Sequence, residues 1–313
     1  EMLRLAPNLF VARTSASTWT ITARGQSDNA ADQAFSNKLL VLIDGRSVYT
    51  PLFSGVYWDM QDVLPEDIER IEVISGPGAT LWGANAVNGV INIITRKSSD
   101  TQGLVAEAGG GNLDSAAGLR YGGRVGQGAT YRIYARALNT QDTETRSGAG
   151  AHDHWSRLQG GFRFDWTPGD RDEVSIHGDA FNGSAANFDS MSGGNLVARW
   201  AHAADNGSSL QVQAYVDREQ RGHDVTGGTP LWVNTYDIDL QHSFLLGARN
   251  AVVWGGGLRK AEYHVEGTPS LQFSPAKGDL NRSNRVVQER RTVTPTLRLI
   301  LGLKFEDDPY SGW

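Results

Sequence analysis

Cysteine is missing from this 313-residue chain, so it forms no disulfide, no thiolate zinc site and no thiol nucleophile. Long apolar runs are missing too: the longest, 39–43, is far shorter than the roughly 20 residues that a membrane-spanning helix needs. Basic charge is not in excess, since the net charge is −6 and no segment forms a basic tail. Nucleic acid is therefore not expected as a partner.

Catalytic motifs are also missing. No GxSxG, HExxH or Walker-type phosphate loop occurs, and GPGATLWG (76–83) has Leu81 where a dinucleotide-binding loop needs its third glycine. His152, Asp153 and His154 could hold a metal, but they lie in a Gly-rich stretch without a third ligand in register, which favours a solvated loop. We expect no enzyme, no resident metal and no cofactor.

What the chain does have is two halves with different patterns. Residues 1–100 are typical of a mixed α/β unit, with a short helix at the start, a second helix over 64–70, and strands near 18–25, 37–45, 70–75 and 89–97. The strand at 37–45 is nearly continuous in apolar residues, which predicts burial on both faces, and it ends at the turn dipeptide Asp44-Gly45.

From about residue 103 the pattern becomes a repeated alternation with period two. In LQGGFRFDW (158–166) apolar and charged side chains take opposite faces, and LRLILGLKF (297–305) repeats the scheme. Alternation alone allows a soluble sandwich, a β-solenoid or a membrane barrel. Repeated charges on the polar face and tryptophans near segment ends favour the barrel, because a barrel has a wet or plugged lumen and aromatic girdles.

Four motifs in order carry a resemblance to a known family: TARG (22–25), LIDGRSV (42–48), IERIEVISGP (68–77) and WGANAVNGVINIIT (82–95). This run resembles the plug domain of TonB-dependent outer-membrane receptors. The resemblance implies an α+β plug domain over 1–100, followed over 101–313 by antiparallel all-β transmembrane barrel strands. Such barrels close at about 22 strands. Residues 101–313 have room for about ten, so we expect an incomplete barrel seen as an open, curved sheet that partly wraps the plug.

The turns that the resemblance marks have their own physical reasons. A glycine on each side of Pro77 allows a chain reversal that bulkier residues would strain. The predicted turn positions are Asp44, Gly45, Gly76, Pro77, Gly83 and Gly89.

Charged residues within or beside the apolar strands need partners. The resemblance implies a latch in which plug arginines, here Arg24 and Arg70, pair with glutamates of the barrel wall. Ser75 departs from the family's pattern, which often has a second arginine just before the Gly-Pro pair. The alternative is a local pair with Glu69 or Glu72. In either case we expect Arg70 to be largely buried and paired with a carboxylate.

The loop 47–60 is rich in aromatic residues, namely Tyr49, Phe53, Tyr57 and Trp58. Such rings suit a planar or hydrophobic ligand such as an iron chelate, and in the resembling family plug loops that face outside help to hold the ligand. The alternative is that these rings pack against the barrel's inner wall.

The expected function is energised uptake of a scarce ligand, most simply a ferric siderophore, across the outer membrane of a Gram-negative bacterium. The resemblance implies three partners: the ligand, outer-membrane lipid and a periplasmic TonB-type energy-coupling protein, whose binding box would precede residue 1. A passive porin or adhesion barrel and a soluble sugar-binding β-sandwich are the alternatives. Neither alternative predicts a plug.

Overall fold

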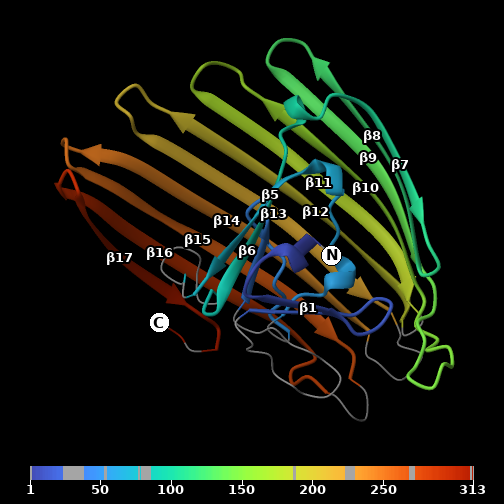
Figure 1. Ribbon diagram of the computed structural model, residues 1–313. Helices are drawn as coiled ribbons and strands as arrows, with labels where there is room; N and C mark the ends of the chain where they lie inside the picture. The colour runs from blue at the N-terminus through green and yellow to red at the C-terminus, as the bar shows by residue number, and fades with distance from the viewer. Residues whose placement is uncertain are drawn as a thin grey trace.

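The computed structural model describes residues 2–23, 39–52, 55–76, 78, 86–185, 188–222, 230–267, 272–310 and 312. Within these ranges the chain forms a small N-terminal module and a long series of antiparallel strands, which we call the wall. Figure 1 shows the wall as a curved sheet with β1, β5 and β6 of the module on its concave side.

The described residues of the module form two small sheets and four 3-10 helices (η). Its elements are η1 (Met2–Leu5), β1 (Leu9–Arg13), β2 (Trp19–Ala23), β3 (Leu39–Ile43), β4 (Arg46–Ser47), η2 (Trp58–Met60), η3 (Pro65–Asp67), β5 (Ile68–Ser75), β6 (Gly89–Thr95) and η4 (Ser98–Asp100). β1 pairs with β2, and the other sheet has the order β4-β3-β6-β5 with β3 and β6 parallel. The two central strands are nearly continuous in apolar residues because both of their faces are covered.

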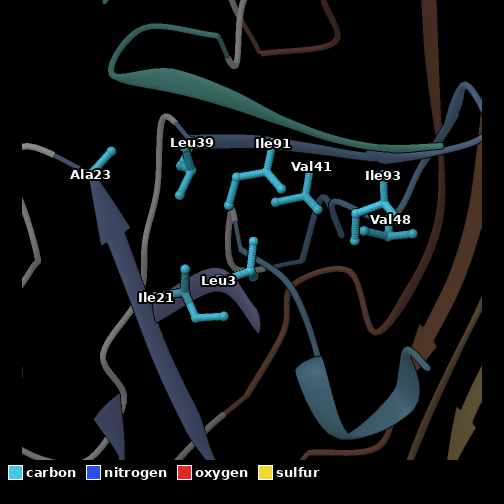
Figure 2. Packing of buried hydrophobic residues seen from close by; sticks show 8 residues of the cluster. All are labelled: Leu3, Ile21, Ala23, Leu39, Val41, Val48, Ile91 and Ile93. Carbon is cyan, nitrogen blue, oxygen red and sulfur yellow. The ribbon is translucent and has the colours of Figure 1, made fainter. Parts of the chain in front are cut away.

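The module has its own hydrophobic core. Figure 2 shows Leu39 and Val41 of β3 beside Ile91 and Ile93 of β6, with Leu3 and Ile21 facing them from η1 and β2. All six side chains are buried. Each such burial stabilises a fold by about 1.5–3 kcal/mol. This core fixes the sheet from which the polar turns of the module extend.

The two predicted helices are corrected by the structure. In place of a helix over 64–70, a single 3-10 turn occupies Pro65–Asp67, and β5 already begins at Ile68. At the start of the chain a 3-10 turn, Met2–Leu5, replaces the other helix. The reason at 68–75 is the run of isoleucine and valine, which favours strand pairing with β6 over extension of the helical turn.

The wall is an eleven-stranded sheet in which every strand pairs antiparallel with the next one along the chain. Its strands are β7 (Gly103–Gly110), β8 (Asp114–Val125), β9 (Ala129–Thr140), β10 (Trp155–Trp166), β11 (Asp172–Ala185), β12 (Phe188–Ala203), β13 (Ser209–Arg221), β14 (Leu231–Leu246), β15 (Asn250–Val265), β16 (Lys277–Thr294) and β17 (Leu297–Asp307). Among the described strands β7 and β17 are the two open edges. The predicted open sheet of about ten strands is confirmed.

Burial in the wall is inverted relative to a water-soluble sheet. On β10, Leu158 is 54% exposed while Arg157, its neighbour, is 3% exposed. Phe162 and Trp166 share the outer face with Leu158, as the alternation predicted. Apolar side chains outside and charged ones inside are what a wall in a lipid bilayer requires. In the described part of the chain, no helix has the length and apolar character needed to cross a membrane.

The two rims of the wall differ in their connections. One rim has the short turns 126–128, 167–171, 204–208, 247–249 and 295–296, and we call it the short-turn rim. The other has the short turn 111–113 and the longer segments 141–154, 222–230 and 266–276, and we call it the long-loop rim. Outer-membrane barrels have short periplasmic turns and longer extracellular loops. By this rule the short-turn rim faces the periplasm.

Candidate gating interface

The module contacts the wall through charged side chains that are almost fully buried. Asp67, at the end of η3, is 2% exposed and lies between two wall arginines. Its Oδ1 accepts a hydrogen bond of 2.6 Å from Arg120 of β8, and its Oδ2 lies 3.0 Å from Nε of Arg132 of β9. Arg132 also donates to the carbonyl of Arg96 at 2.6 Å. Two buried guanidinium groups therefore share one module carboxylate.

Two more aspartates of the segment 58–67 repeat this arrangement. Asp62 accepts a hydrogen bond of 2.8 Å from Nη1 of Arg136 on β9, and Asp59 pairs with Arg221 at the end of β13. Burial raises the pKa of Asp62, and the positive charge of Arg136 opposes that rise. Removal of Arg136 would thus leave a buried carboxyl group with little reason to ionise.

One buried cation of the module faces acidic residues of the wall. Nη1 of Arg46 on β4 donates to Oδ1 of Asp217 on β13 at 3.1 Å, and Gln61 donates to Glu219 at 2.6 Å. Burial alone would lower the pKa of Arg46, but Asp217 and its acidic neighbours outweigh burial and raise that pKa. The guanidinium group therefore stays charged although it is buried.

The Asp44-Gly45 turn joins β3 to β4 and also contacts the wall. Both residues have positive φ, 49° and 82°, as a two-residue type I′ hairpin requires. Asp44 accepts hydrogen bonds from the backbone N–H of Thr95 at 2.8 Å and from its hydroxyl at 2.7 Å, and Arg163 of β10 lies 3.7 Å away. A Cβ at position 45 would lie 2.6 Å from Nε2 of Gln213, so the turn packs tightly on β13.

The Asp44-Gly45 turn lies toward the short-turn rim, near Arg163, whereas the β1–β2 hairpin contacts the wall at the long-loop rim. Arg13 pairs with Asp114 at the start of β8 at 2.9 Å. Asp153 accepts hydrogen bonds from the backbone N–H of Ala16 at 2.8 Å and from that of Thr143 at 2.7 Å. Burial alone would raise the pKa of Asp153, but the hydrogen bonds that it accepts outweigh burial and lower that pKa. The module is thus held at both rims.

The segment His152–His154 has a structural role through its central residue. Asp153 is buried and joins the loop to the module, whereas His152 and His154 are exposed and lie 4.0 and 3.4 Å from Asp142. Among the described residues, no group of three or more ligating side chains is arranged to hold a metal ion.

The expected burial of Arg70 is wrong. Its side chain is 50% exposed and bonds to Glu69 and Glu72 on its own strand, the local alternative to a wall latch. Hydrogen bonds from Arg70 and then Asn92 lower the pKa of Glu72. The physical reason is position: β5 is an edge strand of its sheet, and its charged side chains pair along the strand.

The other predicted latch and turn residues divide into two groups. Gly76 has φ of 98°, a conformation that favours glycine, and a Cβ at Gly89 would lie 2.6 Å from the carbonyl of Ile74, so β5 and β6 approach closely there. Arg24, Pro77 and Gly83, together with Phe53 of the aromatic loop, lie outside the described residues.

The three described aromatic residues of the 47–60 loop lie in different surroundings. Tyr49 packs on the cluster of Leu40, Leu42, Ala86 and Val90. Tyr57 packs between module and wall, 4.0 Å below the guanidinium of Arg221, and burial raises the pKa of its phenol. Trp58 packs on the module's main core. Only Tyr57 packs against the wall, the alternative role considered for these rings, whereas Tyr49 and Trp58 pack within the module.

The charges across the interface are mainly the reverse of the predicted latch. The latch has module arginines facing wall glutamates, whereas the buried contacts above are mainly module aspartates facing wall arginines. A signal was present: the segment 59–67 contains Asp59, Asp62 and Asp67, and the inward positions of 120–163 contain repeated arginines. The sequence of 59–67 predicts an acidic surface, and that of 120–163 predicts a basic one. Only the fold shows that these two surfaces contact each other.

Comparison with known proteins identifies relatives of the module. Residues 1–90 match the family described as TonB-dependent Receptor Plug Domain. The chain is 34% identical over 113 residues to the Vitamin B12 transporter BtuB of Vibrio vulnificus, covering 36% of this chain and 17% of that protein. It is 37% identical over 116 residues to the Rhizobactin receptor of Rhizobium meliloti, covering 35% and 15%.

Solved structures share the fold over nearly the whole chain. The Copper transporter OprC aligns with a TM-score of 0.73 at 16% identity, over 97% of this chain and 51% of that one. The siderophore receptor PirA from Pseudomonas aeruginosa aligns with a TM-score of 0.71 at 19% identity, over 99% and 55%. The chain thus spans about half the length of these proteins, and their likeness concerns the arrangement of module and wall.

Proposed function

We propose that this chain is part of a TonB-dependent receptor, and that the whole protein takes up a scarce small ligand by energised gating. Like its relatives, it resides in the outer membrane of a Gram-negative bacterium. Ligand binds from the long-loop rim, and a periplasmic TonB-type protein displaces the module from the short-turn side. The chemistry is binding and conformational change, with no covalent step.

The observation that carries this proposal is the buried ionic contact between module and wall, above all Asp67 between Arg120 and Arg132. Such a contact holds the module on the concave face, where an open pore would need free space. A passive porin needs no such module. A soluble β-sandwich would not place leucine and phenylalanine outside and arginine inside.

The ligand proposed is a ferric siderophore. Support comes from relatives described as a rhizobactin receptor and a ferric enterobactin receptor. Relatives described as vitamin B12 and copper transporters define the competing ligands.

The test uses a strain deleted for the full-length gene and grown under iron limitation with single ferric siderophores. We expect growth to fail with one siderophore and to return on complementation. The same strain given limiting vitamin B12 or copper is the control. A defect seen only there would overturn the siderophore assignment, and recovery of the protein in the soluble periplasmic fraction would overturn the receptor function.

A further inference from the structure

One sector of the wall has a concentration of inward-facing arginines. Three neighbouring strands, β8, β9 and β10, supply them, and all lie on the concave face against the module: Arg120, Arg132, Arg136, Arg157 and Arg163. In the β9–β10 register Arg132 lies directly opposite Arg163. Like charges at directly opposed positions destabilise a sheet unless anions compensate for them.

Most of the compensating groups come from the module and not from the wall. Arg120 and Arg132 share Asp67, Arg136 contacts Asp62, and Arg157 donates to the carbonyl of Asp59 at 2.8 Å. The wall itself supplies two carboxylates. Asp165 lies 2.9 Å from Arg163, and Glu107 lies 3.5 Å from Arg136. Displacement of the module would therefore leave Arg120 and Arg132 without the carboxylate that they share.

The basic sector is local to these strands. The next inward-facing charges along the wall are mainly acidic, on β11, β13 and β14: Asp179, Asp217, Glu219, Asp237 and Asp239. The buried module cation Arg46 faces this acidic sector. The module thus presents carboxylates to the basic sector and Arg46 to the acidic sector, where Asp59 also pairs with Arg221 at the end of β13.

The arginines also extend along most of the height of the wall. On β10, Arg157 lies two residues from the end at Trp155, and Arg163 lies three residues from the other end at Trp166. Six residues of strand separate these two arginines, which corresponds to roughly 20 Å.

We propose that the β8–β10 arginines form a path for an anionic ligand, exposed when the module is displaced. In the closed state the module's aspartates occupy the positions that the anionic groups of the ligand take during passage. The ligand class is a small molecule that carries carboxylate, catecholate or phosphate groups, since these are the anions that arginine pairs with. This inference rests on the proposed function and adds the sign of the charge on the ligand that passes along the wall.

The test is ion selectivity of the full-length receptor in a planar bilayer, with urea added until channels open. In a KCl gradient the reversal potential gives the permeability of chloride relative to potassium. Replacing Arg120 and Arg132 together by glutamine should lower this ratio at least about threefold, because two lumen charges are lost at low ionic strength. Replacing both by lysine should keep the ratio, because the charge is kept.

The double variant Arg259→Gln with Asp237→Asn is the matched control. These two residues also face inward, but they pair with each other on the wall and stay together when the module moves, so replacing both leaves the net lumen charge unchanged and we expect the ratio to be kept. An unchanged ratio in the double glutamine variant, or an equal change in the lysine variant, would overturn the inference. The ion-selectivity measurement needs neither a siderophore nor a coupling protein. Failure of the growth test would therefore leave the selectivity result valid, and failure of the selectivity test would leave the growth result valid.

Discussion

Asp67→Asn is the substitution that tests the interface most directly. Asparagine keeps the size of the side chain but removes the charge that Arg120 and Arg132 share. Breaking a buried ion pair by removing one partner costs about 3–5 kcal/mol, because the remaining charge is left buried and uncompensated. Two guanidinium groups are affected here, but Arg132 keeps its hydrogen bond to the carbonyl of Arg96. We therefore expect the module to lose about 3 kcal/mol of stability.

Cysteine is absent from these 313 residues, and any cysteine elsewhere in the full-length receptor is replaced by serine so that one introduced thiol can be followed. A single thiol introduced as Ala86→Cys lies at a fully buried position of the module and reacts with a maleimide only when the module opens. The fraction labelled is followed against urea concentration in the full-length receptor in detergent. A loss of about 3 kcal/mol should move the midpoint down by 1 M urea or more, for slopes of about 1–3 kcal/mol per molar.

The control is Glu66→Gln, in the same 3-10 turn. Glu66 is exposed, and the same change of charge there should alter stability by no more than about 0.5 kcal/mol. Equal midpoints for Asp67→Asn and Glu66→Gln would refute the reasoning, since the buried carboxylate would then contribute no more than an exposed one. A double-mutant cycle with Arg132→Gln should recover part of the loss, because the second change removes one of the unpaired charges.

Two more predictions concern the same interface. Burial raises the pKa of Asp62, so the folded module binds this proton more tightly than the unfolded module does. As pH falls from neutral through the raised pKa, wild type should gain stability relative to Asp62→Asn, and a pH-independent difference in thiol-labelling midpoints would contradict this. Gly45→Ala should cost about 1–2 kcal/mol, from the left-handed backbone and from contact with Gln213. A second change, Gln213→Ala, should relieve only the contact, so complete recovery in the double variant would show that backbone strain is absent.

The fold could be predicted from sequence wherever a local pattern decides it. The apolar run 39–43 and the Asp-Gly dipeptide specify a buried strand and its turn, and period-two alternation specifies which wall residues face inward. The predicted helix over 64–70 was wrong because Ile68 and the residues after it gain more from pairing with β6 than from one more helical turn. Local propensity is a weak guide where tertiary pairing competes with it.

The interface could not be predicted in the same way. Asp67 meets Arg120 and Arg132, which lie more than 50 residues away in sequence, and their contact depends on how the module is rotated within the wall. Alternation shows that an arginine faces inward, but it carries no information on what lies opposite. Arg70 shows the converse, since its charge beside an apolar strand indicated a buried partner and the structure gives it two exposed neighbours.

The polar character of the interface fits a module that must be held and also released. Apolar contacts would hold it, but each square ångström of apolar surface exposed on displacement costs about 25 cal/mol with nothing to offset it. Buried ion pairs behave differently, because the large desolvation cost of Asp67 and its arginines is recovered when water enters the lumen. The net contribution of these ion pairs to stability is therefore modest. They nevertheless require one position of the module, since a misplaced module would leave charges buried and unpaired. A basic sector facing Asp62 and Asp67 and an acidic sector facing Arg46 thus set one orientation of the module without making its displacement prohibitively costly.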